Sequence, residues 1–271
     1  MSSLAWRIEA SEPSLVAQVP YARSSSHEVC EKIAVLEVLR YPSPYLTSPS
    51  ALVIAGDLQF WSFASSEGPR IPLGVRLSEE LARLSAQHVL PAPSDVAVIL
   101  TGDLYADEVG TMGASGPVQM VWRAFHWRFP WVVGVLGNHD EVDEGFRRLA
   151  TGPDAFPQLL DASIVQVGGL RVAGVAGIVG NPRKPGRRRE EDYLEVVRQM
   201  GAMNPDVLVM HESPSGFGAG QPGNQRLREL FDIMPPMLVC CGHVHWSAPV
   251  ARLASGTVIV NAETRCVILA P

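Results

Sequence analysis

From residue 51 onward, short apolar runs alternate with stretches in which apolar residues recur every three or four positions. The apolar runs predict strands at the following positions: 51–56, 96–101, 131–136, 162–168, 170–177, 206–210 and 237–241. The intervening spacing is that of one helix face, so we expect helices at about 77–89, 117–128, 141–150, 189–202 and 224–233. The C-terminal runs 249–254, 257–261 and 265–269 are all strand-like. Strands that alternate with helices and then end in antiparallel runs indicate an α/β (α+β) fold with mixed, layered sheets.

Residues 1–50 have a different pattern. The segment from Val29 to Leu39 has helical spacing, and the prolines of Tyr41-Pro42-Ser43-Pro44 then favour an extended linker. We therefore divide the chain into an N-terminal extension, residues 1–50, packed on a domain formed by residues 51–271. A lid or a partner-binding arm is the alternative role for the extension.

Composition narrows the class of protein only mildly. A chain of 271 residues with 46% hydrophobic and 18% charged residues is typical of one compact globular domain. The net charge of −6 gives no general attraction to nucleic acid or to an anionic membrane, although it leaves specific nucleic-acid binding open. The four cysteines do not form a disulfide framework, and the first residues do not resemble a secretion signal, so we expect a cytoplasmic enzyme. The sequence does not indicate an oligomeric state.

Residues with metal-binding side chains directly follow five of the apolar runs. They lie in Gly56-Asp57, Gly102-Asp103, Gly137-Asn138-His139-Asp140, Met210-His211 and Gly242-His243-Val244-His245. A single aspartate after a strand and a glycine is often only a turn or cap residue. That explanation does not account for two such aspartates beside this set of histidines. The pattern predicts a metal centre assembled from several loops.

In their order and strand-end context, these motifs resemble those of the calcineurin-like metallophosphoesterases, from about residue 51 to the end. The resemblance implies a four-layer αββα sandwich, in which two mixed sheets lie face to face with helices outside. It also implies a metal-dependent phosphoesterase that hydrolyses a small phosphodiester or a nucleotide. Within the family, the segment from His211 to Gly216 looks like a loop of small single-domain phosphodiesterases.

The resemblance also assigns roles to residues of this chain. It implies two divalent ions, manganese, iron or zinc, one held by Asp57, Asp103 and His245 and the other by Asp103, Asn138, His211 and His243. A bridging carboxylate offsets the repulsion between two such ions, and Asp103 is the candidate. A hydroxide held between the ions would attack phosphorus. His139 would protonate the leaving oxygen or stabilise the transition state, with Asp140 placed to orient it.

One position departs from the family pattern. The family usually has Asp-x-His in the first motif, whereas this chain has Asp57-Leu58-Gln59. An amide oxygen binds these metals less strongly than imidazole does, so we expect the first metal site to be the weaker one. Gln59 is therefore a candidate ligand of that site; the alternative is a hydrogen-bond donor that lies behind the ligands.

The segment 182–189 concentrates basic residues in an otherwise acidic protein, and within it Arg183 and Arg187 are candidates to bind a substrate phosphate. The alternative is a solvated charged face, because Glu190, Glu191 and Asp192 follow at once. Two other functions stay open. One is a phosphomonoesterase like the Ser/Thr protein phosphatases, and the other is a binding or scaffold protein that retains the fold. No membrane partner is expected.

Overall fold

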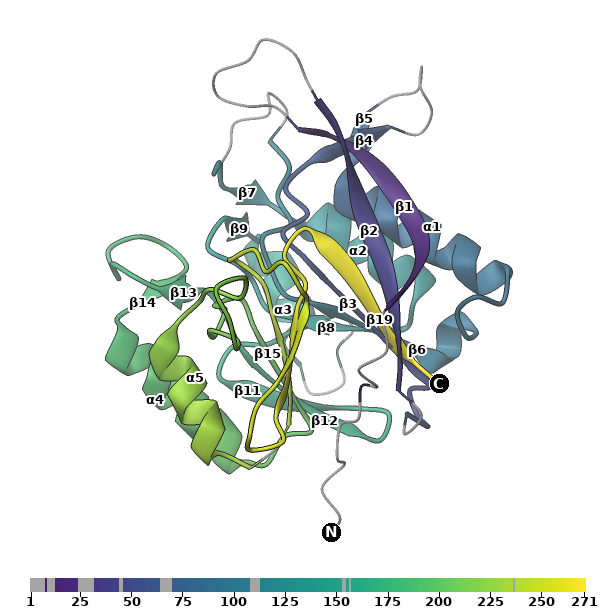
Figure 1. The fold of residues 1–271 in the computed structure, drawn as a ribbon. Coiled ribbons are helices and arrows are strands. Elements are labelled where there is room, and N and C mark those ends of the chain that lie inside the picture. Colours follow the sequence, from purple (N-terminus) through teal and green to yellow (C-terminus); the bar gives the residue numbers. More distant parts are fainter. Residues whose placement is uncertain are drawn as a thin grey trace.

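The computed structural model describes the following residues: 8, 13–23, 32–43, 46–63, 70–107, 113–152, 155, 157–235 and 237–271. In this part of the chain two large sheets face each other (Figure 1). The larger has nine strands in the order β10-β8-β6-β3-β19-β2-β1-β4-β5, and the smaller has six in the order β11-β12-β15-β16-β18-β17.

The strands of the nine-stranded sheet are β1 (Ser14–Arg23), β2 (Lys32–Pro42), β3 (Ala51–Gly56), β4 (Trp61–Phe63), β5 (Arg70–Pro72), β6 (Val96–Leu100), β8 (Trp131–Gly134), β10 (Gln158–Leu159) and β19 (Arg265–Ala270). Those of the six-stranded sheet are β11 (Ser163–Val167), β12 (Leu170–Val175), β15 (Val207–Met210), β16 (Leu238–Cys241), β17 (Val250–Arg252) and β18 (Val258–Asn261). Two short pairs join β7 (Gly116–Pro117) to β9 (Asp140–Glu141) and β13 (Ile178–Val179) to β14 (Arg187–Arg188). The helices are α1 (Leu73–Ala86), α2 (Gln119–Arg128), α3 (Glu144–Leu149), α4 (Glu190–Ala202) and α5 (Gln225–Ile233), with a 3₁₀ turn at Pro93–Asp95.

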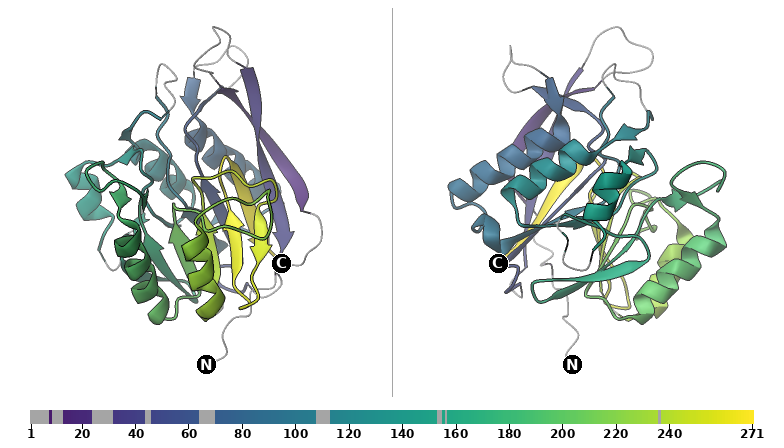
Figure 2. Two further views of the ribbon diagram at one scale, coloured as in Figure 1. Left: turned by 60° about the vertical axis from the view of Figure 1, so that its left-hand side comes forward. Right: turned by 180° about the vertical axis from the view of Figure 1, so that it is seen from behind.

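Three hydrophobic layers hold four layers of secondary structure together. In β3, Leu52 and Ile54 face the six-stranded sheet, while Val53 and Ala55 face the helices α1 and α2. The outer face of the six-stranded sheet packs in the same way on α4 and α5. Because side chains alternate along a strand, each central strand is buried on both faces and its sequence is a continuous apolar run. Figure 2 shows the two helix layers on opposite sides of the molecule. This arrangement confirms the predicted αββα sandwich.

Parallel pairing brings the predicted ligand loops to one edge of the sandwich. β3, β6 and β8 run parallel in one sheet, and β12, β15, β16 and β18 run parallel in the other. The carboxyl ends of parallel neighbours lie at the same edge of a sheet, which is where ligands bind in such folds. The loops after β3, β6 and β8 therefore meet the loops after β15 and β16.

The predicted helix from Val29 to Leu39 is wrong where the structure describes it. Residues 32–42 form β2, which pairs antiparallel with β1 and parallel with β19, while residues 29–31 lie outside the described residues. Leu36 and Val38 are buried, whereas Val35 is 44% exposed, so the burial period is two. The β-branched side chains here suit a strand, and a C-terminal strand is available to pair with it. The hairpin of β1 and β2 thus belongs to the same sheet as β3.

Candidate metal centre

Three of the predicted ligands have a left-handed backbone. Asp57, Asp103 and His243 have φ values of 52°, 53° and 68°. A positive φ is uncommon for residues other than glycine and is concentrated at functional sites. Each residue comes directly after a buried strand and its glycine, so this sharp turn directs its side chain away from the strand and over the sheet edge.

The glycines before the ligands allow the loops to stack closely. A Cβ atom on Gly102 would lie 2.5 Å from the Gly137 nitrogen, and one on Gly137 would lie 2.0 Å from Oδ1 of Asp103. A Cβ atom on Gly242 would likewise lie 2.4 Å from Oδ2 of Asp57. These contacts give a physical reason for the Gly-Asp, Gly-Asn and Gly-His pairs, because any side chain at the glycine would push the ligand loops apart.

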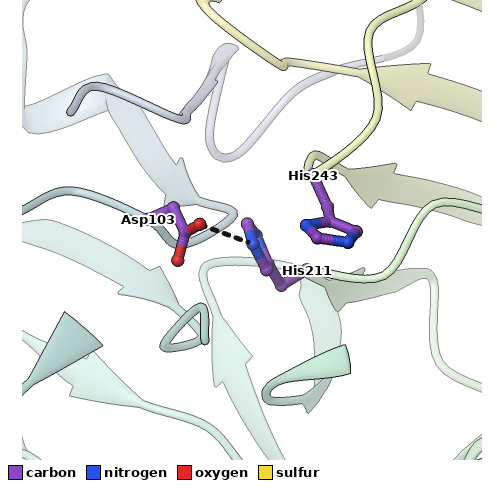
Figure 3. Close-up of side chains that lie close together, drawn as sticks. All are labelled: Asp103, His211 and His243. Atoms are coloured by element: carbon purple, nitrogen blue, oxygen red, sulfur yellow. Dashed lines mark ion pairs between the residues drawn. The ribbon is translucent and has the colours of Figure 1, made fainter. Parts of the chain in front are cut away.

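The centre of the site is the group of Asp103, His211 and His243, whose ligand atoms lie within 4.8 Å of one another (Figure 3). His211 lies between the other two, with its Nε2 3.2 Å from Oδ2 of Asp103. Its Nδ1 lies 2.8 Å from the carbonyl oxygen of Thr101, which can only accept a hydrogen bond. That contact holds the proton on Nδ1 and leaves the Nε2 lone pair facing the carboxylate. Two facing lone pairs require a proton or a cation between them.

The charges around this group also suit a cation. Burial and the neighbouring carboxylates of Asp103 and Glu263 raise the pKa of Asp57 to about 8, although His211 opposes the shift. Burial lowers the pKa of His211, but the carboxylates of Asp103 and Asp57 outweigh it and raise the value overall. Buried carboxylates that repel one another are stabilised by a divalent ion.

Asn138 adds an unsatisfied buried oxygen to the same site. Its Oδ1 is buried without a hydrogen-bond partner among the described residues. Leaving such a group unpaired costs about 1–3 kcal/mol, and buried groups of this kind call for a specific explanation. An amide oxygen can bind a metal ion. The Oδ1 atom of Asn138 therefore fits as a further ligand of an ion held by Asp103, His211 and His243.

The predicted contact between Asp140 and the His139 ring is replaced by another arrangement. Oδ2 of Asp140 accepts hydrogen bonds from the nitrogens of Asp103 (2.8 Å) and Gly137 (3.0 Å), and its Oδ1 accepts one from Leu104 (2.7 Å). Both carboxylate oxygens therefore hold the loops after β6 and β8 in register. Asp140 is a positioning residue for those loops.

The ring of His139 instead lies beside a serine. Its Nδ1 is 3.3 Å from Oγ of Ser115, in the loop that leads into β7, and its backbone nitrogen donates to Oδ1 of Asp103 at 3.0 Å. A hydroxyl group can donate or accept, so Ser115 can pair with Nδ1 in either protonation state of the ring. Ser115 is a site residue that the sequence analysis missed, because no motif surrounds it.

Gln59 and His245, the remaining candidates for the first metal, lie outside the central group. The side-chain amide nitrogen of Gln59 is buried without a hydrogen-bond partner among the described residues. The His245 side chain is 65% exposed, and its Nδ1 is 2.5 Å from Oε2 of Glu263. No sequence motif surrounds Glu263. Ligation by Gln59 and His245 stays a prediction.

Of the two predicted phosphate-binding arginines, Arg187 lies in a loop next to the site, and its guanidinium donates to the carbonyl oxygen of Pro185 at 3.1 Å. Burial and the charge of His211 lower the pKa of His243 to about 4, and Arg187 contributes to the same shift. The loop that carries Arg187 packs on the loop of Asn138, because a Cβ atom on Gly186 would lie 2.7 Å from the Cα of Asn138. Arg183 is exposed in the turn of this loop. A pocket of about 880 Å³ adjoins Arg187 and is bordered by Gly137, Asp140 and Arg147.

A four-layer sandwich with a cluster of aspartate and histidine at its strand ends defines a metal-dependent hydrolase. The chain matches the family of calcineurin-like phosphoesterases over residues 51–247 and belongs to that family. It is therefore a metallophosphoesterase, a hydrolase that acts on phosphoric ester bonds. No described helix is long and apolar enough to cross a membrane.

A solved structure supports the fold. TT1561 of Thermus thermophilus is 14% identical with a TM-score of 0.53, and the match covers 79% of this chain and 89% of that one. Two further matches have lower TM-scores. The sulfate thiohydrolase SoxB of Thermus thermophilus is 16% identical with a TM-score of 0.39, covering 70% of this chain and 37% of that one. A 5'-nucleotidase precursor from Thermus thermophilus is 14% identical with a TM-score of 0.41, and the match covers 79% of this chain and 48% of that one. A search of curated proteins gave no match.

Proposed function

We propose that the protein hydrolyses a small phosphodiester or a nucleotide with the help of two divalent ions, manganese, iron or zinc. The observation that carries this proposal is the group of Asp103, His211 and His243, with ligand atoms within 4.8 Å of one another and His139 beside them. The second ion would be held by this group together with Asn138. The first would be held by Asp57, Asp103 and His245, with Gln59 at the corner where the family has histidine.

The chain's own residues then have distinct tasks. Bound divalent ions would stabilise charge on the phosphoryl oxygens and lower the pKa of a water molecule that attacks phosphorus. His139 donates a proton to the leaving oxygen, and the Ser115 hydroxyl at Nδ1 holds the ring for that transfer. Asp140 keeps the loops of Asp103 and Asn138 together through their backbone. Arg187 binds a non-bridging phosphoryl oxygen, and Arg183 lies further out in the same loop.

The surroundings of the site favour a diester over a monoester. A pocket of about 880 Å³, which shares Gly137 and Asp140 with the loop after β8, has the volume of a small-molecule site and would accept the second ester group of a diester. Its lining combines apolar residues such as Leu160 and Ile164 with Arg147.

Two alternative functions fit the residues less well. The Ser/Thr protein phosphatases carry His-Gly-Gln in the first motif, where this chain has Gln59-Phe60-Trp61. Their second motif also differs from Tyr105-Ala106-Asp107. A binding or scaffold descendant is favoured by Gln59 alone. His139, its partner Ser115 and the unsatisfied Asn138 oxygen favour catalysis instead.

A comparison of three substrates tests the proposal. Protein loaded with Mn²⁺ should hydrolyse bis-p-nitrophenyl phosphate with a higher kcat/KM than p-nitrophenyl phosphate, and should leave a phosphothreonine peptide intact. The Asp103→Asn protein, purified in parallel, controls for a contaminating phosphatase. Preference for the monoester or for the peptide would refute the diester proposal. Metal binding without any hydrolysis would favour the scaffold alternative.

A further inference from the structure

The pocket of about 880 Å³ is lined by residues from the edge strands of both large sheets. β10 is the last strand of the nine-stranded sheet and β11 the last of the six-stranded sheet, and they contribute Leu159 and Ile164 to the lining. The loops of Gly137 and Gly186 also border the pocket, and they pack against each other at Asn138. A substrate whose phosphorus lies at the metal centre can therefore extend one ester group between the sheets.

Two arginines in the lining have no carboxylate partner. Arg147, on α3, is exposed and forms no ion pair in the part of the chain that the structure describes, whereas the next residue, Arg148, pairs with Glu144 at 3.2 Å. The guanidinium of Arg187, in β14, donates to the carbonyl oxygen of Pro185, and no carboxylate of the described residues pairs with it. Guanidinium groups without an acidic partner at a pocket are available to an anion.

The three carboxylates of the lining do not neutralise these arginines. Asp161 pairs with Arg188 at 2.6 Å, and both oxygens of Asp140 accept hydrogen bonds from backbone nitrogens. Glu141, in β9, is exposed and forms no ion pair with either arginine. The pocket therefore keeps two cations that are not paired with an acid.

Gln158 adds a buried acceptor to the same pocket. The residue is 3% exposed, and its Nε2 donates to the carbonyl oxygen of Gly152 at 2.9 Å, which fixes the orientation of the amide. Its Oε1 is buried without a hydrogen-bond partner among the described residues. A buried acceptor of this kind calls for a donor, so the lining also suits a ligand with a hydroxyl or amino group.

We propose that this pocket binds a second anionic group of the substrate, and that Arg147 is the residue that selects for it. This inference rests on the proposed function and narrows its substrate class to a phosphodiester of a polar alcohol that itself bears a phosphate. The planar guanidinium of Arg147 matches two oxygens of that phosphate. A hydroxyl or amino group of the same alcohol donates to Gln158.

Two p-nitrophenyl diesters that differ by a single phosphate test the inference. Thymidine 5'-(p-nitrophenyl phosphate) and the same ester with a 3'-phosphate have the same leaving group, and release of p-nitrophenol by the Mn²⁺-loaded protein gives kcat and KM for both. We expect wild type to have a roughly tenfold lower KM for the 3'-phosphorylated ester, the effect of one charge-assisted contact. The preference should decrease as NaCl is added, because salt screens an exposed guanidinium.

Substitutions at two neighbouring arginines separate a specific contact from general charge. Arg147→Gln should raise the KM for the 3'-phosphorylated ester about tenfold, while its kcat and both constants of the other ester stay unchanged. Arg147→Lys retains the charge without the planar fork and should keep part of the preference. Arg148→Gln is the matched control, because it removes a guanidinium from the same helix that does not line the pocket.

Equal KM values for the two esters in wild type, or equal effects of Arg147→Gln and Arg148→Gln, would overturn the inference. Binding provides a readout without turnover. Calorimetry should show that wild type binds thymidine 3',5'-bisphosphate about tenfold more tightly than thymidine 5'-phosphate, and that Arg147→Gln does not distinguish them. The proposed function fails separately, when the metal-loaded protein hydrolyses neither ester.

Discussion

The close stacking of the ligand loops makes Gly102→Ala a demanding test of the site's construction. Gly102 has a φ of 95°, and a Cβ atom there would approach the nitrogen of Gly137 to 2.5 Å and its Cα to 2.8 Å. The neighbouring atoms are backbone atoms, so they cannot rotate away as the end of a side chain would. The added methyl group must therefore either distort its own turn or separate the loops of Asp103 and Asn138.

The expected loss of stability has two parts. A backbone conformation that is unfavourable for residues with a Cβ atom costs of order 1–3 kcal/mol. Forcing an extra methyl group into a packed region costs typically ~1–3 kcal/mol more. We therefore expect Gly102→Ala to lower the free energy of unfolding by about 2–6 kcal/mol, a large part of the ~5–15 kcal/mol that stabilises a typical domain.

Two other glycines separate these contributions. Gly113 has a φ of 74°, but the nearest atom to its Cβ position is Cε1 of His139 at 3.6 Å, so Gly113→Ala tests the backbone conformation alone. Gly218 has nothing within 4 Å of its Cβ position, and Gly218→Ala is the control for both effects. Urea denaturation of the metal-free proteins should rank them in the order Gly218→Ala, Gly113→Ala and Gly102→Ala, from least to most destabilised. Metal content should fall in Gly102→Ala only. Stability of Gly102→Ala equal to that of Gly113→Ala would refute the stacking argument.

Three further predictions concern the site residues, and a fourth concerns the cysteines. His139→Ala should lower turnover of the diester by ~10²–10⁴-fold while metal content, measured by plasma mass spectrometry, stays at the wild-type level. Ser115→Ala should lower kcat by roughly tenfold without changing KM, because it removes one hydrogen bond that holds the ring, and an unchanged kcat would exclude the contact. Asp103→Asn should lose both ions on dialysis, since the bridging charge is removed, and two retained equivalents would rule out the bridge. In a Cys30→Ser protein, the remaining thiols of Cys240, Cys241 and Cys266 should react with a thiol reagent only after unfolding. Burial raises the pKa of all three, so little reactive thiolate forms in the folded protein.

The elements that carry the ligands could be predicted because their signals are local. Each central strand is buried on both faces, so a run such as Leu52 to Ala55 is continuously apolar in the sequence. The glycine and ligand that follow it mark the strand end. Parallel pairing then collects those ends at one edge, and this is why the order of the motifs alone indicated where Asp103, His211 and His243 meet.

The N-terminal strand β2 could not be predicted in this way. Ile33, Leu36 and Leu39 fit a helical period, while the burial of Leu36 and Val38 follows the strand period, and the sequence contains both patterns. Whether this segment forms a helix or a strand depends on β19, which lies more than 200 positions later in the chain and pairs with β2. A local pattern contains no information about a partner so distant.

The supporting residues of the site were likewise decided only by the tertiary structure. Ser115 contacts His139 across 24 positions, and Glu263 contacts His245 across 18, without a motif around either supporting residue. Asp140 has both oxygens on backbone nitrogens, a role that its side-chain type does not reveal. The sequence by itself indicated the candidate ligands, because each follows a strand end that is recognisable from its local pattern. The structure decided what holds those ligands, because these contacts depend on how loops that are remote in the sequence pack together.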